Sequence, residues 1–184
     1  MNFIIEKAGQ SDAEAIAAII KTCYEYLEHK EWYVPDNAEY IRDLLTSPQV
    51  YDETLPGNGL HGIAYKAICA ENNRLAGIFT VAFPGDGPKS MGHDIGFSLE
   101  QCRLLAHMDS ATVLPEFRGF RLQYRLMAAA EEELRGMGFH YLAATVHPEN
   151  HASKGTMLRL GYQVMATKEK YNGNIRNIML KTLM

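Results

Sequence analysis

The chain changes from a strand into a helix within Val113-Leu114-Pro115-Glu116-Phe117-Arg118-Gly119-Phe120-Arg121-Leu122-Gln123. The proline ends the strand, and Gly119 lets the backbone turn tightly into the helix. The first N–H groups of a helix have no partner inside it and carry the positive end of its dipole. With Arg118, Arg121 and Arg125 beside them, these groups are suited to phosphate oxygens. An ordinary turn with solvated arginines is the alternative that the spacing alone leaves open.

The composition favours one globular domain. Hydrophobic residues make up 47% and charged residues 22% of 184 positions, which predicts a single domain over residues 1–184. Lys and Arg number 18 against 22 Asp and Glu, so the net charge is −4. A mildly acidic chain argues against broad binding of nucleic acid or of anionic membranes. A local cluster must therefore hold any anionic ligand.

The cysteines and the N-terminus indicate a reducing compartment. Cys23, Cys69 and Cys102 show no C-x-x-C spacing, which favours buried thiols over a disulfide or zinc framework. No grouping of His, Asp and Glu has metal-ligand spacing, so no metal site is expected. The first residues lack a signal-peptide pattern, and no apolar run approaches the roughly 20 residues that span a bilayer. We expect a cytoplasmic protein.

Periodicity and turn residues predict an α/β domain with a mixed sheet, because hairpins alternate with helical crossovers. An S-x-x-E pattern at Ser11 and Glu14 predicts a capping box at the first helix. The expected strands cover 2–6, 63–70, 75–83, 103–114, 141–146 and a closing hairpin that turns at Asn172-Gly173. The expected helices cover 11–27, 38–45, 119–136 and 150–160, and the stretch 47–62 reads as a loop.

This element order and the V-x-P-x-x-R-G pattern resemble the GNAT superfamily of N-acetyltransferases. The family signature at this turn is Arg/Gln-x-x-Gly-x-Gly/Ala, which cradles the pyrophosphate of acetyl-coenzyme A. Arg118 and Gly119 match it, whereas Arg121 and Gln123 occupy the positions of the two later small residues. Downstream, Pro148-Glu149-Asn150-His151-Ala152-Ser153 followed by Gly161-Tyr162 is similar to the family's P-x-N-x-x-S segment and its closing Gly-[FY].

The resemblance implies acetyl-CoA as co-substrate, held where the strand ending at Val113 splays from the strand 141–146. A backbone N–H near Val113 would polarise the acetyl carbonyl. The cofactor-binding residues that it implies are Val113, Arg118, Gly119, Phe120, Arg121, Leu122, Gln123, Asn150 and Ser153.

Two polar residues on that strand are candidate catalytic bases. Strand alternation predicts that His107, Asp109, Ala111 and Val113 share one face. In relatives, a Glu or His base lies four or six positions before the closing Val, which corresponds here to Asp109 and His107. Solvent exposure or structural hydrogen bonding of this pair is the alternative reading.

The resemblance identifies no proton donor for the leaving thiolate. The Tyr that many relatives carry four positions before Gly161 is replaced by Met157, while Tyr162 and Tyr171 are near in sequence. Trp32 and Tyr33 could line an acceptor pocket or pack between the first two helices.

The sequence therefore predicts an N-acetyltransferase in which a primary amine of a small molecule or peptide attacks acetyl-CoA directly. A non-catalytic acyl-CoA-binding or regulatory module on the same fold is the alternative. The C-terminal hairpin is a candidate edge for a homodimer.

Overall fold

The computed structural model describes residues 1–47 and 52–183. Seven strands form one sheet in the order β1-β2-β3-β4-β5-β7-β6. All neighbouring strands are antiparallel except β4 and β5, which run parallel. The predicted α/β class with a mixed sheet is thus confirmed. The strands are β1 (Phe3–Lys7), β2 (Gly62–Cys69), β3 (Arg74–Ala82), β4 (Leu105–Val113), β5 (Tyr141–Val146), β6 (Gln163–Lys170) and β7 (Asn174–Thr182).

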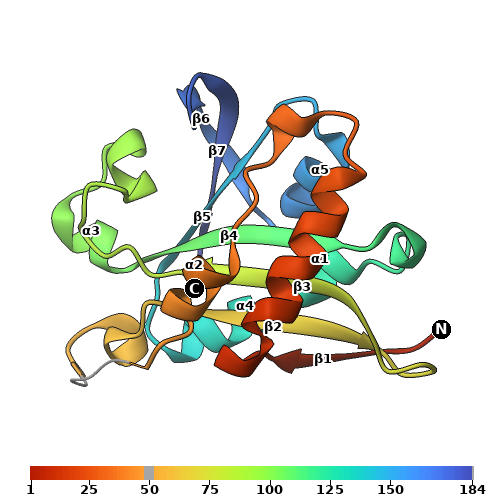
Figure 1. The fold of residues 1–184 in the computed structure, drawn as a ribbon. Coiled ribbons are helices and arrows are strands. Elements are labelled where there is room, and N and C mark those ends of the chain that lie inside the picture. The colour runs from red at the N-terminus through yellow and green to blue at the C-terminus, as the bar shows by residue number, and fades with distance from the viewer. Residues whose placement is uncertain (48–51, 184) are drawn as a thin grey trace.

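Helices cover both faces of the sheet. In Figure 1, α1 and α2 cross the near face and α4 lies behind the strands. The apolar stripe of α4, which includes Leu122, Leu126 and Leu134, is fully buried against the far face. The stripe of α1 packs a second core, and each of its buried isoleucines stabilises the fold by roughly 1.5–3 kcal/mol. The helices are α1 (Ala13–Glu25), α2 (Ala38–Leu44), α3 (Leu99–Arg103), α4 (Leu122–Gly136) and α5 (His151–Arg159).

The two parallel strands separate soon after they meet. β4 and β5 pair only from Leu105 opposite Tyr141 to His107 opposite Ala143. Beyond that point β5 continues against β7, up to Val146 opposite Asn177. The backbone edge of β4 from residue 108 to 113 therefore has no strand partner on the β5 side. This opening is the gap that the sequence analysis placed beside Val113.

A β-bulge in β4 changes which side chains share a face. Phe79 pairs with Ala111 and Val81 with Met108, so Asp109 and Ser110 together lie opposite Thr80. After the bulge, Ala111 and Val113 pack with the α4-side core. The prediction that His107 and Asp109 share a face with these two residues is wrong, because the extra residue reverses the alternation.

Several local predictions also needed correction. The Ser11 and Glu14 capping box does not form: a 3₁₀ turn (Gln10–Asp12) precedes α1, and Asp12 accepts the N–H of Gly9 at 2.9 Å. α3 occupies the start of the long strand expected from residue 103, so β4 begins at Leu105. A capping box of Ser98 and Gln101 starts α3, and this pattern was missed.

Two expected loops differ in detail from the prediction. The loop expected over 47–62 contains a short 3₁₀ turn (Pro56–Gly59), while residues 48–51 of it lie outside the described residues. The β6–β7 turn contains three residues of positive φ, Tyr171, Asn172 and Gly173, so it is one residue longer than expected.

The three cysteines are buried and unpaired, as expected of core thiols. Among the helices that the structure describes, none is long and apolar enough to cross a bilayer.

Candidate active site

The turn after β4 presents a set of free backbone donors. Gly119 has φ +87° and Arg121, the residue before α4, has φ +57°. The N–H groups of residues 119–124 find no acceptor among the described residues, and Arg125 is the first to bond back, to the carbonyl of Arg121 at 3.0 Å. Free donors at a helix start are suited to anions such as phosphate. The turn therefore offers unpaired donors that an anionic ligand can use.

The arginines of this turn differ in their availability. Arg118 and Arg121 are exposed, and no ion pair within the described chain occupies either of them. Arg125 is used structurally, because its guanidinium donates to the carbonyl of Phe3 at 2.8 Å. Two cations are thus available to an anionic ligand here.

The second sequence motif meets the first in space. The side-chain amide of Gln123, on α4, donates to Oγ of Ser153 at 2.9 Å. Asn150 caps α5 by accepting the N–H of Ser153 at 3.2 Å. The starts of α4 and α5 are thereby joined beside the opening between β4 and β5.

The remaining predicted cofactor residues have mixed environments. Leu122 is buried in the α4 core and Val113 is partly buried against it. Phe120 is 40% exposed and its ring lies 5.2 Å from that of Phe3, on the β1 side of the turn.

Asp109 lies at the bulge with the hydroxyl of Tyr40, from α2, donating to its Oδ2 at 2.7 Å. Desolvation by the surrounding protein raises the pKa of Asp109. The hydrogen bond from Tyr40 lowers this pKa and so offsets part of the rise. Its side chain nevertheless reaches solvent, as a residue that meets a substrate must.

A second carboxylate, Asp36, lies on the same side of β4. It precedes α2, and its Oδ2 accepts a 2.5 Å hydrogen bond from Oγ of Ser110. Burial, together with the neighbouring charge of Asp109, raises the pKa of Asp36 to about 6. A carboxyl group that titrates close to neutral pH is suited to general base catalysis.

His107 is held in a structural hydrogen bond. Its Nε2 accepts the backbone N–H of Met91 at 2.9 Å, so this nitrogen is not free to take a proton from a substrate. Burial and the charge of Lys170 lower the pKa of His107 to about 4, and the ring is neutral at pH 7. Of the two predicted bases, the structure therefore favours Asp109.

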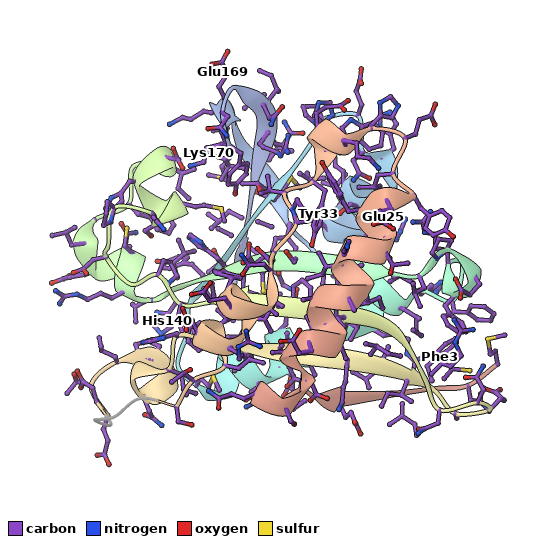
Figure 2. The ribbon with its side chains drawn as sticks, in the orientation of Figure 1. Phe3, Glu25, Tyr33, His140, Glu169 and Lys170 are labelled. Atoms are coloured by element: carbon purple, nitrogen blue, oxygen red, sulfur yellow. The ribbon has the colours of Figure 1, made fainter. Side chains whose placement is uncertain are left out.

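Tyrosines complete the surroundings of the two carboxylates. The Tyr33 hydroxyl lies 3.4 Å from Oγ1 of Thr112, and Figure 2 shows this residue at the upper end of α1. Across the opening, the Tyr171 hydroxyl lies 3.2 Å from Oγ1 of Thr145 on β5. Met157, by contrast, is buried in the α4 core and has no place in the site.

The α1–α2 connection, residues 26–37, bridges the opening at its upper end in Figure 1. Trp32 stacks on His29 and on His147, with ring centroids 4.4 and 5.5 Å away. Arg176 of β7 donates to the carbonyl of Glu31 at 2.6 Å. The indole N–H of Trp32 is buried with no acceptor in the part of the chain that the structure describes. These contacts tie the α1 side to the β5 side.

Sequence reasoning missed the positions of Asp36 and Tyr40. Asp36 was visible only as part of a helix start, since Pro35-Asp36-Asn37 is a common capping composition. Their distance along the chain from β4 hid their contact with Asp109 and Ser110.

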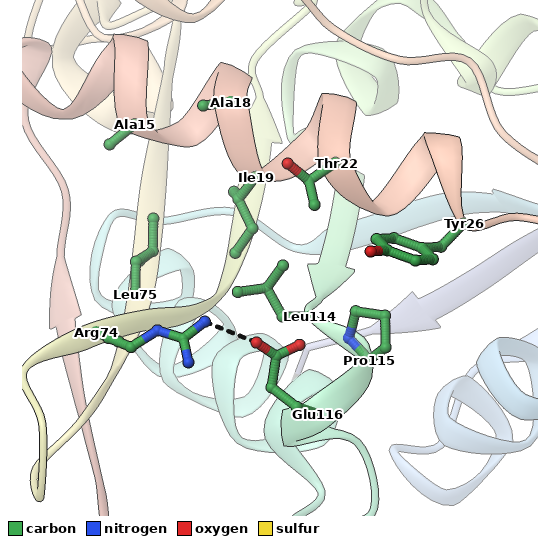
Figure 3. Close-up of a pocket in the computed structure, with 10 residues that line it drawn as sticks. All are labelled: Ala15, Ala18, Ile19, Thr22, Tyr26, Arg74, Leu75, Leu114, Pro115 and Glu116. Carbon is green, nitrogen blue, oxygen red and sulfur yellow. Dashed lines mark hydrogen bonds and ion pairs between the residues drawn. The ribbon is translucent and has the colours of Figure 1, made fainter.

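In the described part of the chain, a pair of cavities lies on the α1 side of the sheet. One, of about 600 Å³, lies between α1 and the ends of β3 and β4, with the Arg74–Glu116 ion pair at its rim (Figure 3). The other, of about 530 Å³, is lined by Tyr40 and His107. Only the second, although smaller, is lined by a residue, Tyr40, whose hydroxyl bonds to one of the carboxylates.

A comparison with protein families decides the assignment. The model of the Acetyltransferase (GNAT) family matches residues 13–162. The chain belongs to the GNAT acetyltransferase family. The resemblance found in the sequence is thereby confirmed, as is the assignment of the chain as an N-acetyltransferase at the level of the family. A comparison with curated protein sequences gives no match.

Solved structures show the same GNAT fold at low identity. A GNAT-family acetyltransferase from Streptococcus pneumoniae is 16% identical, with a TM-score of 0.71 and 100% of both chains covered. Arabidopsis thaliana NAA60 with a bisubstrate analogue is 12% identical, with a TM-score of 0.70 and 98% of each chain covered. The paia N-acetyltransferase of Thermoplasma acidophilum, in complex with coenzyme A, is 16% identical, with a TM-score of 0.63 and 100% of both chains covered.

Proposed function

We propose that this protein transfers the acetyl group of acetyl-CoA to a primary amine by direct attack, with Asp36 and Asp109 as the proton-accepting pair. The observation that carries the proposal is the pair itself. It stands at the bulge of β4, where the strand edge becomes free, and one of its members has a pKa of about 6. Family membership and relatives solved with coenzyme A support acetyl-CoA as co-substrate.

Acetyl-CoA supplies a thioester carbonyl as the electrophile. The free N–H groups of residues 119–124 and the cations Arg118 and Arg121 fit its phosphates. Gln123, Asn150 and Ser153 hold the two helix starts together beside it. The unpartnered edge of β4, residues 108–113, offers backbone groups along which an extended amide chain can lie.

The acceptor arrives as an ammonium ion and must lose a proton to attack. Asp36 has released its own proton by pH 7 and accepts one from the ammonium, while Tyr40 keeps Asp109 oriented. Repulsion between the two carboxylates favours this transfer, because one added proton relieves it. On the opposite side of the opening, the hydroxyl of Tyr171 is our candidate donor to the leaving thiolate.

The non-catalytic acyl-CoA-binding module remains the second candidate. Arg121 in place of a glycine and buried Met157 in place of a tyrosine favour it. We also keep two smaller proposals. Free buried thiols support a cytoplasmic location. Exposed Val164 and Met165 on the edge strand β6 support a homodimer edge, which light scattering would test.

The test is calorimetric titration with acetyl-CoA, coenzyme A and NAD, followed by a screen of primary amines for thiol release. Micromolar binding of both CoA species without NAD, and amine-dependent thiol release, would support the enzyme. Binding without release for any amine would favour the module. No binding of either CoA species would overturn both.

A further inference from the structure

The second cavity lies beside Tyr40, the residue that bonds to Asp109 of the proposed proton-accepting pair. Its walls come from α2, from the end of β3 and from the first part of the long β3–β4 connection. Tyr40 lines the cavity and also donates its hydroxyl hydrogen bond to Asp109. His107 lines it as well and precedes Asp109 by two strand positions, before the bulge, so both lie on this face. The side chain of Tyr40 thus lies between the cavity and Asp109, so a molecule in the cavity is one side chain away from this carboxylate.

The inner wall of this cavity is apolar. It consists of Leu44, Ala82, Phe83, Pro84 and Pro88, together with the ring of Tyr40. Phe83 is held by ring contact with Phe139, 4.6 Å away, and the prolines stiffen the connection. This wall is thus pre-formed, as ligand sites usually are.

The charges of the cavity are few and of opposite sign. Asp43 and Lys89 both lie at the exposed rim. His107 adds no charge at neutral pH, because burial and the charge of Lys170 lower its pKa to about 4. Among the described residues that line the cavity, Asp43 is the one carboxylate and it is exposed, so no buried carboxylate is present to hold a second ammonium group.

We propose that this cavity receives the apolar body of the acceptor, so that the substrate is a primary amine attached to an aromatic or branched aliphatic group without a second positive charge. This inference rests on the proposed function, since the amine end must reach the Asp36–Asp109 pair. The same chemistry occurs in a free arylalkylamine and in a peptide with an N-terminal phenylalanine. The cavity volume, about 530 Å³, lies within the range of small-molecule sites.

The first experiment compares amines on the wild-type protein. Phenethylamine and a phenylalanine-first peptide are measured against ethylamine and putrescine, by kcat/KM and by calorimetric binding to the protein loaded with coenzyme A. The apolar amines are expected to exceed the other two by at least about tenfold. The ratio between the free amine and the peptide tells which source the cavity accepts. Equal or better use of putrescine would overturn the inference.

The second experiment fills the cavity. Ala82 pairs with His107 across β3 and β4, and its side chain lines the open space, so Ala82→Leu adds volume there. We expect the KM for phenethylamine to rise about tenfold or more while the affinity for acetyl-CoA stays the same. Ala18→Leu, on α1 in the other cavity, is the matched control and should change neither.

These results distinguish failure of the acceptor cavity from failure of the proposed acetyl transfer. An Ala82→Leu protein with unchanged KM would place the acceptor elsewhere and overturn the inference, while acetyl transfer itself would stand. Binding of phenethylamine to the CoA-loaded protein without any turnover would support the cavity and overturn the proposed catalysis. If Ala82→Leu fails to fold, the amine comparison on the wild-type protein still decides.

Discussion

Oγ of Ser110 donates a 2.5 Å hydrogen bond to Oδ2 of Asp36, although the two residues lie 74 positions apart in the chain. The bond fixes Asp36 over the bulge of β4, beside Asp109. It also stabilises the carboxylate form of Asp36, which limits the pKa rise that burial causes.

The first prediction concerns the pH dependence of catalysis. Acetyl transfer should fall as the pH drops through about 6, because Asp36 then keeps its proton. Asp36→Asn should lower kcat about 100-fold or more and remove this acid limb. Steady-state rates between pH 5 and 8 measure both effects, with the exposed Glu39→Gln as control. An unchanged profile in Asp36→Asn would exclude Asp36 as the base.

Asp36 also makes the free energy of unfolding depend on pH. The pKa of Asp36 is raised from 3.8 to about 6 by folding, so its contribution to stability is full below 3.8 and is lost as the pH rises through 6. The contribution of His107 to stability changes with pH in the opposite direction, because folding lowers its pKa from 6.5 to about 4. Denaturant unfolding at pH 7 should therefore show Asp36→Asn to be more stable than the wild type.

The second prediction concerns the Tyr40–Asp109 hydrogen bond. Since this bond lowers the pKa of Asp109, Tyr40→Phe should raise that pKa, which a carbon-13 NMR titration of the Asp109 carboxyl group measures. The exposed Tyr26→Phe makes the same chemical change away from the site and should leave the Asp109 titration unaltered. An unchanged Asp109 titration in Tyr40→Phe would contradict this coupling.

The third prediction compares two arginines of the phosphate turn. Arg118→Ala should weaken acetyl-CoA binding by about 1–3 kcal/mol, the scale of a hydrogen bond to a charged group. Arg125→Ala should leave the affinity unchanged and destabilise the fold, since its guanidinium is bonded to the Phe3 carbonyl. Calorimetry and thermal unfolding separate the two. Equal effects of both substitutions on affinity would refute the assignment of Arg118 to the phosphates.

The fourth prediction concerns the left-handed backbone at Arg121, where φ is +57°. A side chain in this conformation costs roughly 1–2 kcal/mol that glycine avoids. Arg121→Gly should therefore raise the free energy of unfolding by up to about 1 kcal/mol, after its larger loss of chain entropy. Arg121→Ala keeps the strain and should bring no such gain. Weaker acetyl-CoA binding by both variants would show that the arginine charge contacts the phosphates.

The fifth prediction uses the single tryptophan of the chain. Trp32 lies in the α1–α2 connection with its ring stacked on His147, which precedes the cap of α5. Filling the cleft with coenzyme A should change its environment and shift its fluorescence emission. The exposed-surface change Glu28→Gln should preserve the shift, and His147→Ala should reduce it. An emission spectrum that does not change at saturating coenzyme A would place the ligand away from this connection.

Much of the fold could be predicted because it depends on local patterns. The strand 141–146 was placed at its observed bounds, and the buried stripe of α4 follows from the spacing of Leu122, Leu126 and Leu134. The prediction of capping boxes was less reliable. Ser11 and Ser98 begin equally good sequence patterns, but only Ser98 forms the capping box, because the tertiary packing around each helix start differs.

The sequence by itself determined the strand-to-helix turn, since it depends on residues adjacent in the chain from Val113 to Gln123, and this turn with the motif over 148–162 indicated the family. Only the tertiary structure decided which groups meet beside Asp109. The bulge that turns Asp109 away from the α4 side arises from pairing with β3, and no single strand encodes it. Asp36 and Tyr40 reach β4 through the packing of α2, a contact between distant segments that hydrophobic burial brings together and that carries no local periodicity.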